Sequence, residues 1–299
     1  MEISKIPIIK IPINKGIEIF IKREDLIDPD ISGNKFWKLL HNIKNYLGTH
    51  PKEPFIITYG GAFSNHIAAT AVLGKKLNIK TLGIIRGEEL NRKWHLNPTL
   101  KKANENKMDF RFVDRESYRD KHKMTLALQE EFPNALIIPE GGTNHLAVEG
   151  IKGMLTSETK YFDYLCSAVG TGGTLAGISK YAEPEQAVIG LKVVNDESLH
   201  QRILSLSQRT NFQLEDAHYG GYGKINDELI RFINEFRAKF GIPLDPVYTG
   251  KAMMKLMKLI DQNYFEIGSK ILMFHTGGLQ GIEGANYLLK KQNRTLIDI

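Results

Sequence analysis

The sequence predicts an α/β protein whose parallel sheets are covered by helices on both faces. Short apolar runs alternate along the chain with longer stretches whose apolar residues recur at helical spacing. Glycine-containing loops stand where several of these runs lead into the next helical stretch. This alternation is typical of parallel sheets, whose strands are buried on both faces. A chain of 299 residues is also long enough for about two domains.

The first half of the chain predicts five strands and five helices. The helix at 35–47 has the clearest pattern, because Phe36, Leu39 and Ile43 fall on one face and Gly48 ends it. Apolar runs rich in β-branched residues predict the strands. In chain order the elements are a strand at 17–21, a helix at 35–47, a strand at 55–59, a helix at 65–77, a strand at 81–85, a helix at 97–104, a strand at 110–113, a helix at 117–132, a strand at 136–138 and a helix at 146–157.

The second half begins with the apolar run 164–169, which predicts a strand followed by a helix that opens at Thr174. Cys166 lies in this run and is expected to be buried and inert, and the methionines at 253–257 are expected to pack in a core. The remaining elements are a helix at 174–181, a strand at 187–194, helices at 197–205, 226–240 and 249–261, a strand at 271–274 and a helix at 279–289.

The composition excludes several classes of protein. Hydrophobic residues make up 42% of the chain and charged residues 25%, which is the ordinary globular range. The net charge of +6 is scattered along the chain, so we expect no nucleic-acid partner. A single cysteine allows no intrachain disulfide, and no run of eighteen apolar residues predicts a membrane span. The N-terminus lacks the pattern of a signal peptide, so a cytoplasmic protein is expected.

Five glycine-containing loops are candidate ligand sites, and the loop 170–174 is the clearest. An apolar strand ends there and Thr174 opens a helix, so backbone N–H groups and hydroxyls can hold a phosphate. A dinucleotide fingerprint would need glycine where Leu175 stands, and no P-loop motif occurs. The alternative is a tight turn that needs glycine for its conformation alone.

Two further positions suggest chemistry. Lys35 falls in the first turn of its helix, where the helix dipole disfavours a positive charge, so a sheltered amine there would suit Schiff-base chemistry. The alternative is a surface lysine. The helix start at Ser64, Asn65 and His66 could bind a carboxylate, or Ser64 or Asn65 could simply cap the helix.

Five motifs in order and spacing resemble the fold type II pyridoxal phosphate enzymes, in particular the branch of 1-aminocyclopropane-1-carboxylate (ACC) deaminase and D-cysteine desulfhydrase. The resemblance covers nearly the whole chain. The motifs are IKREDL at 21–26, SGNK at 32–35, SNH at 64–66, DPVYTGK at 245–251 and HTGG at 275–278.

The resemblance implies a role for each site residue. Lys35 would bind pyridoxal phosphate as a Schiff base and then act as the general base. The other cofactor-binding residues would be Asn65 at the 3′-oxygen, Thr276 at the pyridine nitrogen, and Thr171, Gly172, Gly173 and Thr174 at the phosphate. Substrate would be bound by Ser64, Asn65, His66, Tyr222 and Tyr248, and the catalytic residues would be Lys35, Tyr222 and Tyr248. No metal is expected.

Three positions favour D-cysteine as the substrate. ACC deaminases usually carry Gln, Glu and Leu where this chain has His66, Thr249 and Thr276, which is the desulfhydrase-like set. A hydroxyl beside the pyridine nitrogen would give a weaker electron sink than a carboxylate, adequate for expelling thiolate. The expected enzyme is a lyase that converts D-cysteine and water to pyruvate, hydrogen sulfide and ammonia. The alternatives are ACC deaminase, or a cofactor-binding protein of low turnover.

The chain also departs from the branch. Ala62 and Phe63 replace the usual Ile-Gln, the arginine that usually follows the Ser-Asn motif is absent, and the loop 170–174 resembles the wider superfamily. The family implies a large domain of residues 1–49 plus 151–299, a small inserted domain of residues 50–150, and the cofactor in the cleft between them. It also implies a homodimer that acts on a small amino acid.

Overall fold

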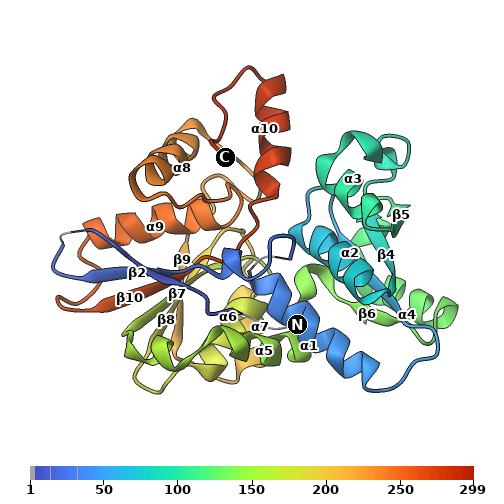
Figure 1. The fold of residues 1–299 in the computed structure, drawn as a ribbon, viewed down its shortest axis with the longest axis horizontal. Helices are drawn as coiled ribbons and strands as arrows, with labels where there is room; N and C mark the ends of the chain where they lie inside the picture. Colours follow the sequence, from blue (N-terminus) through green and yellow to red (C-terminus); the bar gives the residue numbers. More distant parts are fainter. Residues whose placement is uncertain (1–3, 14, 32) are drawn as a thin grey trace.

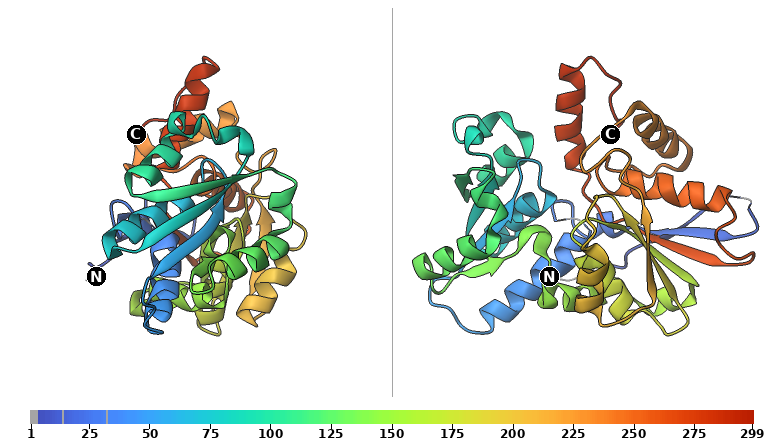
Figure 2. Two further views of the ribbon diagram at one scale, coloured as in Figure 1. Left: turned by 90° about the vertical axis from the view of Figure 1, so that its right-hand side faces the viewer. Right: turned by 180° about the vertical axis from the view of Figure 1, so that it is seen from behind.

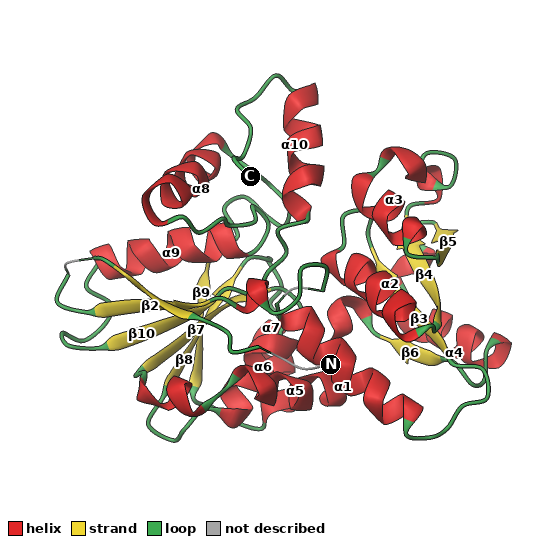
Figure 3. Ribbon diagram, viewed as in Figure 1, coloured by secondary structure: helices red, strands yellow, loops and turns green. Residues whose placement is uncertain are grey.

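The computed structural model describes residues 4–13, 15–31 and 33–299. Two sheets lie in two neighbouring bodies, each flanked by helices (Figures 1 and 3). The larger sheet has the strand order β1-β2-β10-β7-β8-β9 and the smaller one β5-β4-β3-β6. Within the described residues every strand pair is parallel except β1 with β2. The predicted α/β class with mostly parallel sheets is therefore confirmed.

The larger sheet is buried on both faces, and neighbouring residues of one strand enter different cores. Cys166 and Met273 pack in one core, whereas Leu165 and Leu272 pack in the other, as the two-residue period of a strand requires. The strands are β1 (Ile8–Ile11), β2 (Glu18–Lys22), β7 (Tyr164–Val169), β8 (Ala187–Lys192), β9 (Phe212–Asp216) and β10 (Lys270–Phe274). The first core is closed by α8 (Asp227–Phe240), α9 (Thr249–Asp261) and α10 (Gly281–Lys291), and the second by α5 (His145–Ile151), α6 (Gly173–Tyr181) and α7 (Leu199–Ser207).

The smaller sheet is covered in the same way. Ile56 packs with α1 and α2 on one face, and Ile57 faces the core that Leu128 of α4 completes. The strands are β3 (Phe55–Gly60), β4 (Lys80–Arg86), β5 (Met108–Val113) and β6 (Leu136–Ile138). The helices are α1 (Asn34–Leu47), α2 (Asn65–Leu77), α3 (Pro98–Glu105) and α4 (Lys121–Glu131).

Helix α1 connects the two bodies (Figure 2). Its residues Phe36, Leu39 and Ile43 pack in the core of the smaller sheet, while the helix also packs along α5. Val148 and Ile151 of α5 belong to the core of the larger sheet. The domain limits at residues 50 and 150 remain predictions, and we propose that the smaller body ends before α5, near residue 144.

Several predicted elements differ from the structure. The strands β1 and β9 were not predicted, because Ile8–Ile11 is short and flanked by prolines, and Phe212–Asp216 is an edge strand with polar residues. The single helix predicted at 117–132 is divided, since the Asp120 side chain accepts from Lys123 N–H and starts α4 afresh. The helix predicted at 146–157 ends at Ile151 in a 3₁₀ turn, and the strand predicted at 187–194 ends at Lys192.

Other expectations are confirmed. Cys166 is fully buried, and burial raises the pKa of its thiol far above the ordinary value. Met253 and Met254 are buried in the core between α9 and the sheet. In the described part of the chain, no helix is both long and apolar enough to cross a membrane.

Candidate active site

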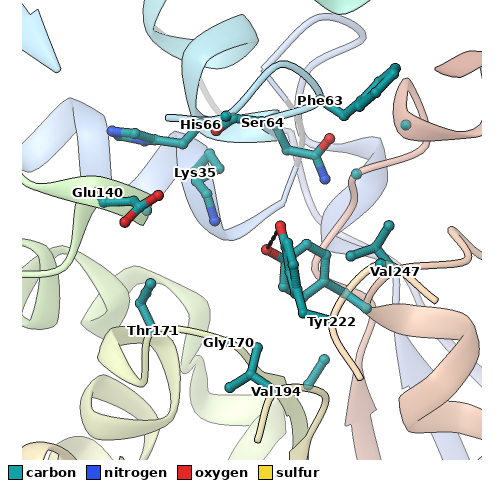
Figure 4. Close-up of a pocket in the computed structure, with 18 of the residues that line it drawn as sticks. Lys35, Phe63, Ser64, His66, Glu140, Gly170, Thr171, Val194, Tyr222 and Val247 are labelled. Carbon is teal, nitrogen blue, oxygen red and sulfur yellow. Dashed lines mark hydrogen bonds between the residues drawn. The ribbon is translucent and has the colours of Figure 1, made fainter. Parts of the chain in front are cut away.

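Both sheets have a point where the strand order changes direction, and the loops at these points line one cavity. In the larger sheet the change lies at β7 and β10, and in the smaller sheet at β3 and β6. Ligands of open α/β sheets bind outside the carboxyl ends of strands at such points. The loops that follow these four strands line a cavity of about 920 Å³ between the two bodies (Figure 4). The fold therefore brings four of the five candidate glycine loops to one site, and the start of α1 adds the fifth.

Lys35 projects into this cavity from the first turn of α1 (Figure 4). Its Nζ lies 3.3 Å from Asn34 Oδ1. Burial lowers the pKa of Lys35 to about 8, although the charge of Asp245 opposes this shift. About a tenth of the Lys35 side chains are therefore neutral at pH 7 and about half at pH 8, far more than for an ordinary lysine, and the neutral amine is the form that attacks a carbonyl carbon. Ser32, which opens the SGNK motif, lies outside the described residues.

Gly33 allows α1 to begin in close contact with the loop after β10, which belongs to the larger body. It has φ of +65°, and a Cβ there would lie 1.8 Å from the carbonyl oxygen of Thr276. Only glycine permits that approach. Thr276 itself lines the cavity and is 8% exposed.

The loop 170–174 carries the N-terminus of α6 to the cavity. Gly172 is the N-cap residue, with φ of +90° and no side-chain cap, so first-turn N–H groups of this nine-residue helix face the cavity without a capping side chain. Asn34 donates to Thr174 Oγ1 at 2.7 Å, and the hydroxyls of Thr171 and Thr143 lie 2.5 Å apart. Gly173 does not line the cavity but begins the helix. The arrangement suits a phosphate group.

Lys38 is a site residue that the sequence reasoning missed. It is 1% exposed, and its Nζ lies 3.2 Å from both Gly141 O and Thr143 Oγ1. A Cβ on Gly173 would lie 3.0 Å from that Nζ, so the lysine reaches the phosphate-type loop. Burial, followed by the nearby charge of Lys35, holds the pKa of Lys38 well below its usual value. The available signal was its position one helical turn after Lys35.

Lys38 lacks a counter-charge within the described residues, where no carboxylate lies at ion-pair distance from it. Burying a lysine without such a partner is unfavourable. An anion at the start of α6 would supply the missing charge.

The loop after β3 presents Ser64, Asn65 and His66 at the start of α2. Ser64 Oγ accepts from Ile67 N–H at 3.3 Å, so the capping interpretation holds for this residue. Asn65 faces the loop after β10, because a Cβ on Gly278 would lie 2.6 Å from its Nδ2. Both residues also line the cavity.

The imidazole of His66 points away from Tyr222 (Figure 4). Its Nε2 lies 2.7 Å from Thr58 Oγ1, and Thr58 donates its own proton to Ile138 O. His66 therefore carries its proton on Nε2 and leaves Nδ1 as an acceptor, which is buried. Burial and the charges of Lys35 and Lys38 keep the pKa of His66 well below its usual value, so the ring is neutral.

Tyr222 and Tyr248 meet across the cavity from Lys35 although they are 26 residues apart in the chain. Their hydroxyls are 2.9 Å apart. Tyr248 is the N-cap residue of α9, and Tyr222 lies in the loop between β9 and α8. Although about half of Tyr222 is exposed, desolvation of the phenols in the cavity raises the pKa of both tyrosines, that of Tyr248 strongly, so both phenols stay protonated at neutral pH.

Asp245 and Thr249 form a buried unit beside the cavity. The carboxylate of Asp245 accepts from the N–H groups of Val247, Tyr248 and Thr249 at 2.7–3.0 Å, and from Thr249 Oγ1 at 2.8 Å. Burial raises the pKa of Asp245. Thr249 is 0% exposed and does not line the cavity, so of the three positions predicted to discriminate between substrates only His66 and Thr276 line it.

Glu140 is a second residue that the sequence reasoning missed, although its loop was identified. Its carboxylate lines the cavity, accepts from the Tyr118 hydroxyl at 3.0 Å and pairs with Lys121 at 3.1 Å. A glutamate after a proline gave no local signal of that position. It adds a negative group to the side of the cavity formed by the smaller body.

The donor set fits an aromatic aldehyde that bears a phosphate. An amine of low pKa is placed for the aldehyde, while an uncapped helix N-terminus and a buried lysine are placed for the phosphate. This donor set, in a cleft between two α/β bodies whose sheets are mostly parallel, defines a fold type II pyridoxal phosphate enzyme.

Comparison with known proteins assigns the family. The family model described as "Pyridoxal-phosphate dependent enzyme" matches residues 1–277, and the chain belongs to this family. The chain is 31% identical to a Pyrococcus abyssi protein named as a candidate ACC deaminase, over 89% of this chain and 86% of that protein. It is 30% identical to the mitochondrial bifunctional D-cysteine desulfhydrase/ACC deaminase of Arabidopsis thaliana, over 89% of this chain and 74% of that protein.

Comparison with solved structures supports the same family. A crystal structure of an ACC deaminase homologue has a TM-score of 0.83 and 29% identity, and the match covers 96% of this chain and 94% of that one. Cystathionine β-synthase of Helicobacter pylori shares the fold, with a TM-score of 0.68, 16% identity, and 93% and 94% of the two chains covered. The protein is therefore a pyridoxal phosphate-dependent enzyme of the ACC deaminase/D-cysteine desulfhydrase family.

Proposed function

We propose that the protein catalyses β-elimination of D-cysteine to pyruvate, hydrogen sulfide and ammonia. The observation that carries this proposal is the pairing, across one cavity, of a lysine whose pKa is about 8 with two hydrogen-bonded tyrosines. Elimination needs a base for the α-proton and an acid for the leaving group. The two sides of the cavity provide these two functions.

Pyridoxal phosphate, when bound, would supply the electron sink for the electron pair that stays on the α-carbon when the α-proton is removed. Nζ of Lys35 is the proposed base, because its neutral form is accessible near neutral pH. The hydroxyl of Tyr222 or Tyr248 is the proposed acid, since both stay protonated and can donate to a departing thiolate. In the overall reaction one D-cysteine and one water become one pyruvate, one hydrogen sulfide and one ammonia.

The remaining residues would bind the phosphate and the carboxylate. We assign the phosphate to Thr171, Gly172, Gly173 and Thr174, with Lys38 as its cationic partner. We assign the 3′-oxygen to Asn65 and the pyridine nitrogen to Thr276. Ser64 and the backbone N–H groups at Asn65 and His66 would bind the substrate carboxylate, because the His66 ring is engaged with Thr58.

D-cysteine is favoured over ACC by the hydroxyl of Thr276, which can donate to an unprotonated pyridine nitrogen. The name of the Arabidopsis relative joins both activities, so ring opening of ACC is the second candidate. The cytoplasmic location and the homodimer remain predictions.

The decisive experiment measures cofactor and products together. The purified protein is reduced with borohydride, which would fix the cofactor on Lys35, and peptide mass spectrometry locates the modification. Wild-type protein is then given D-cysteine, L-cysteine or ACC while pyruvate, sulfide and 2-oxobutanoate are assayed. Pyruvate and sulfide from D-cysteine are expected. If ACC gives 2-oxobutanoate and neither cysteine gives products, the protein is a deaminase. If the cofactor is bound and no product forms, the protein is a binding protein.

A further inference from the structure

Lys251 is a buried charge for which the proposed chemistry has no use. It lies in the first turn of α9 and is 0% exposed. A positive charge is disfavoured at a helix N-terminus, and burial lowers the pKa of Lys251 to about 8. Its Nζ nevertheless has two strong partners, since it donates to His218 O and Gly221 O at 2.7 Å each.

Both partners belong to the loop 217–226, which joins β9 to α8 and carries Tyr222. Tyr219, Gly220, Gly221 and Gly223 all have positive φ. A Cβ at Gly220 or Gly223 would meet no atom within 4 Å, so side-chain packing does not hold these two positions. The ring of Tyr222, between them, contacts that of Tyr248 edge to face. Tyr219 and Ile225, toward its ends, do pack against the core of the larger sheet.

The two acceptors bracket the turn before Tyr222. His218 O also accepts from Gly221 N–H at 3.0 Å, and Gly221 O accepts from Lys224 N–H at 3.2 Å. One ammonium group therefore bonds the first carbonyl of each of two successive turns, 218–221 and 221–224, and the second turn contains Tyr222. Hydrogen bonds from a charged donor are stronger than those between neutral groups.

The same end of α9 also carries Tyr248, whose hydroxyl is 2.9 Å from that of Tyr222. We propose that Lys251 is a positioning residue that clamps the 217–226 loop to α9 and so keeps Tyr222 against Tyr248. The consequence for catalysis rests on the proposed function, whereas the clamp itself does not.

The clamp is tested by amide hydrogen exchange of the protein prepared without cofactor, which needs no activity. In Lys251→Met, peptides covering 217–226 are expected to exchange at least ~10-fold faster than in wild type, while those of α8 keep their rates. The matched control is Lys255→Met, one turn further along α9, whose Nζ pairs with Glu215 on β9 at 3.1 Å. Unchanged exchange of 217–226 in Lys251→Met overturns the proposal.

Should Lys251→Met fail to fold, Lys251→Gln takes its place. The glutamine side chain is polar but uncharged, and it is one bond shorter than that of lysine. Faster exchange confined to residues 217–226 supports the clamp. Exchange rates equal to those of wild type, or faster exchange along the whole chain, overturn it.

The link to Tyr222 is tested by a double-mutant cycle on D-cysteine turnover. Lys251→Met is expected to lower kcat at least ~10-fold in wild type but less than ~2-fold in Tyr222→Phe. Additive losses would overturn the link to Tyr222. If the wild type does not turn over D-cysteine, the proposed function fails, and the exchange experiment still decides whether the clamp exists.

Discussion

At the residue scale, the site depends on two lysines placed one turn apart on α1. Lys35 and Lys38 both face the interior of the molecule, and burial shifts the pKa of each toward the neutral amine. The two side chains have different surroundings. Lys35 lies beside Asn34 in the cavity, and Lys38 is held by Gly141 and Thr143 near the start of α6. Lys35 is thus suited to bond formation, whereas Lys38 would regain its charge beside a bound phosphate and so favour an anionic ligand.

The low pKa of Lys35 predicts how cofactor attachment depends on pH. The value of about 8 lies below the 10.5 of an ordinary lysine side chain. The folded protein therefore loses this proton first, and stability contributed by Lys35 rises with pH between about 8 and 10.5, where the unfolded chain still holds it. Cofactor-free protein should react with pyridoxal phosphate at a rate whose midpoint lies near pH 8. Stopped-flow absorbance measures this, and a midpoint near 10.5 would contradict the assignment.

Lys38 predicts a separate loss of cofactor affinity. Lys38→Met should weaken pyridoxal phosphate binding roughly 10- to 100-fold, because a charge-assisted bond contributes about 1.5–3 kcal/mol. Equilibrium titration with the dephosphorylated analogue pyridoxal is the informative comparison, since pyridoxal should bind wild type and Lys38→Met with similar affinity, whereas the preference for the phosphorylated ligand should fall. Lys44→Met, an exposed position on the same helix, is the control and should keep wild-type affinity. A normal phosphate preference in Lys38→Met would exclude Lys38 from the phosphate site.

At the scale of elements, the start of α1 is the most constrained junction in the site. Gly33 must combine positive φ with close contact to the backbone of Thr276. A buried network supports the strand end before it, since Lys22 pairs with Glu24 at 2.6 Å and Glu24 accepts from Trp37 at 2.8 Å. The IKREDL and HTGG motifs thus act as supports for the lysine-bearing helix.

Gly33→Ala is expected to be among the most destabilising single substitutions in the chain. The added methyl would overlap Thr276 O at 1.8 Å, and backbone atoms cannot move aside cheaply. The cost should exceed that of Gly241→Ala, where φ is +68° and no atom lies within 4 Å, so that only about 1–2 kcal/mol of left-handed strain applies. Chemical denaturation of both variants measures the difference. Equal losses would show that the contact with Thr276 is unimportant.

The scale of elements is also where the sequence predictions hold best. The helix α1, the strand β7 and the helix α9 were predicted to within a residue, because their apolar periodicity and end residues are local properties. The edge strand β9 was missed, since its polar residues carry no burial signal until the neighbouring strand is known. The division of the helix at 117–132 depended on one capping side chain, Asp120.

At the scale of the whole molecule, the cavity lies between two bodies, and each body supplies one of its sides. A part-buried amide pair links α1 to the start of α5, in which Asn144, the N-cap residue of α5, donates to Asn42 Oδ1 at 2.7 Å. The phosphate-type loop belongs to the larger body, and the carboxylate-type loop belongs to the smaller one. A ligand held by both loops adds a further connection between them.

Removing the cofactor should therefore lower the melting temperature of the protein. Binding to the folded state alone contributes about 2.7 kcal/mol at a ligand concentration 100 times Kd. Calorimetry should show a higher Tm for the loaded protein than for the cofactor-free protein, and a smaller difference for Lys38→Met. A Tm that does not respond to pyridoxal phosphate would contradict binding in the cleft.

The sequence by itself determined the order of most strands and helices, the glycines at the strand ends and the place of Lys35, because periodicity, caps and turns depend on neighbours in the chain. Tertiary structure alone decided which loops share a cavity, that Lys38 and Glu140 enter it, and that the ring of His66 turns to Thr58. It also placed Lys251 under the Tyr222 loop. These features arise from strand order and burial, which join residues far apart in sequence and leave no local pattern.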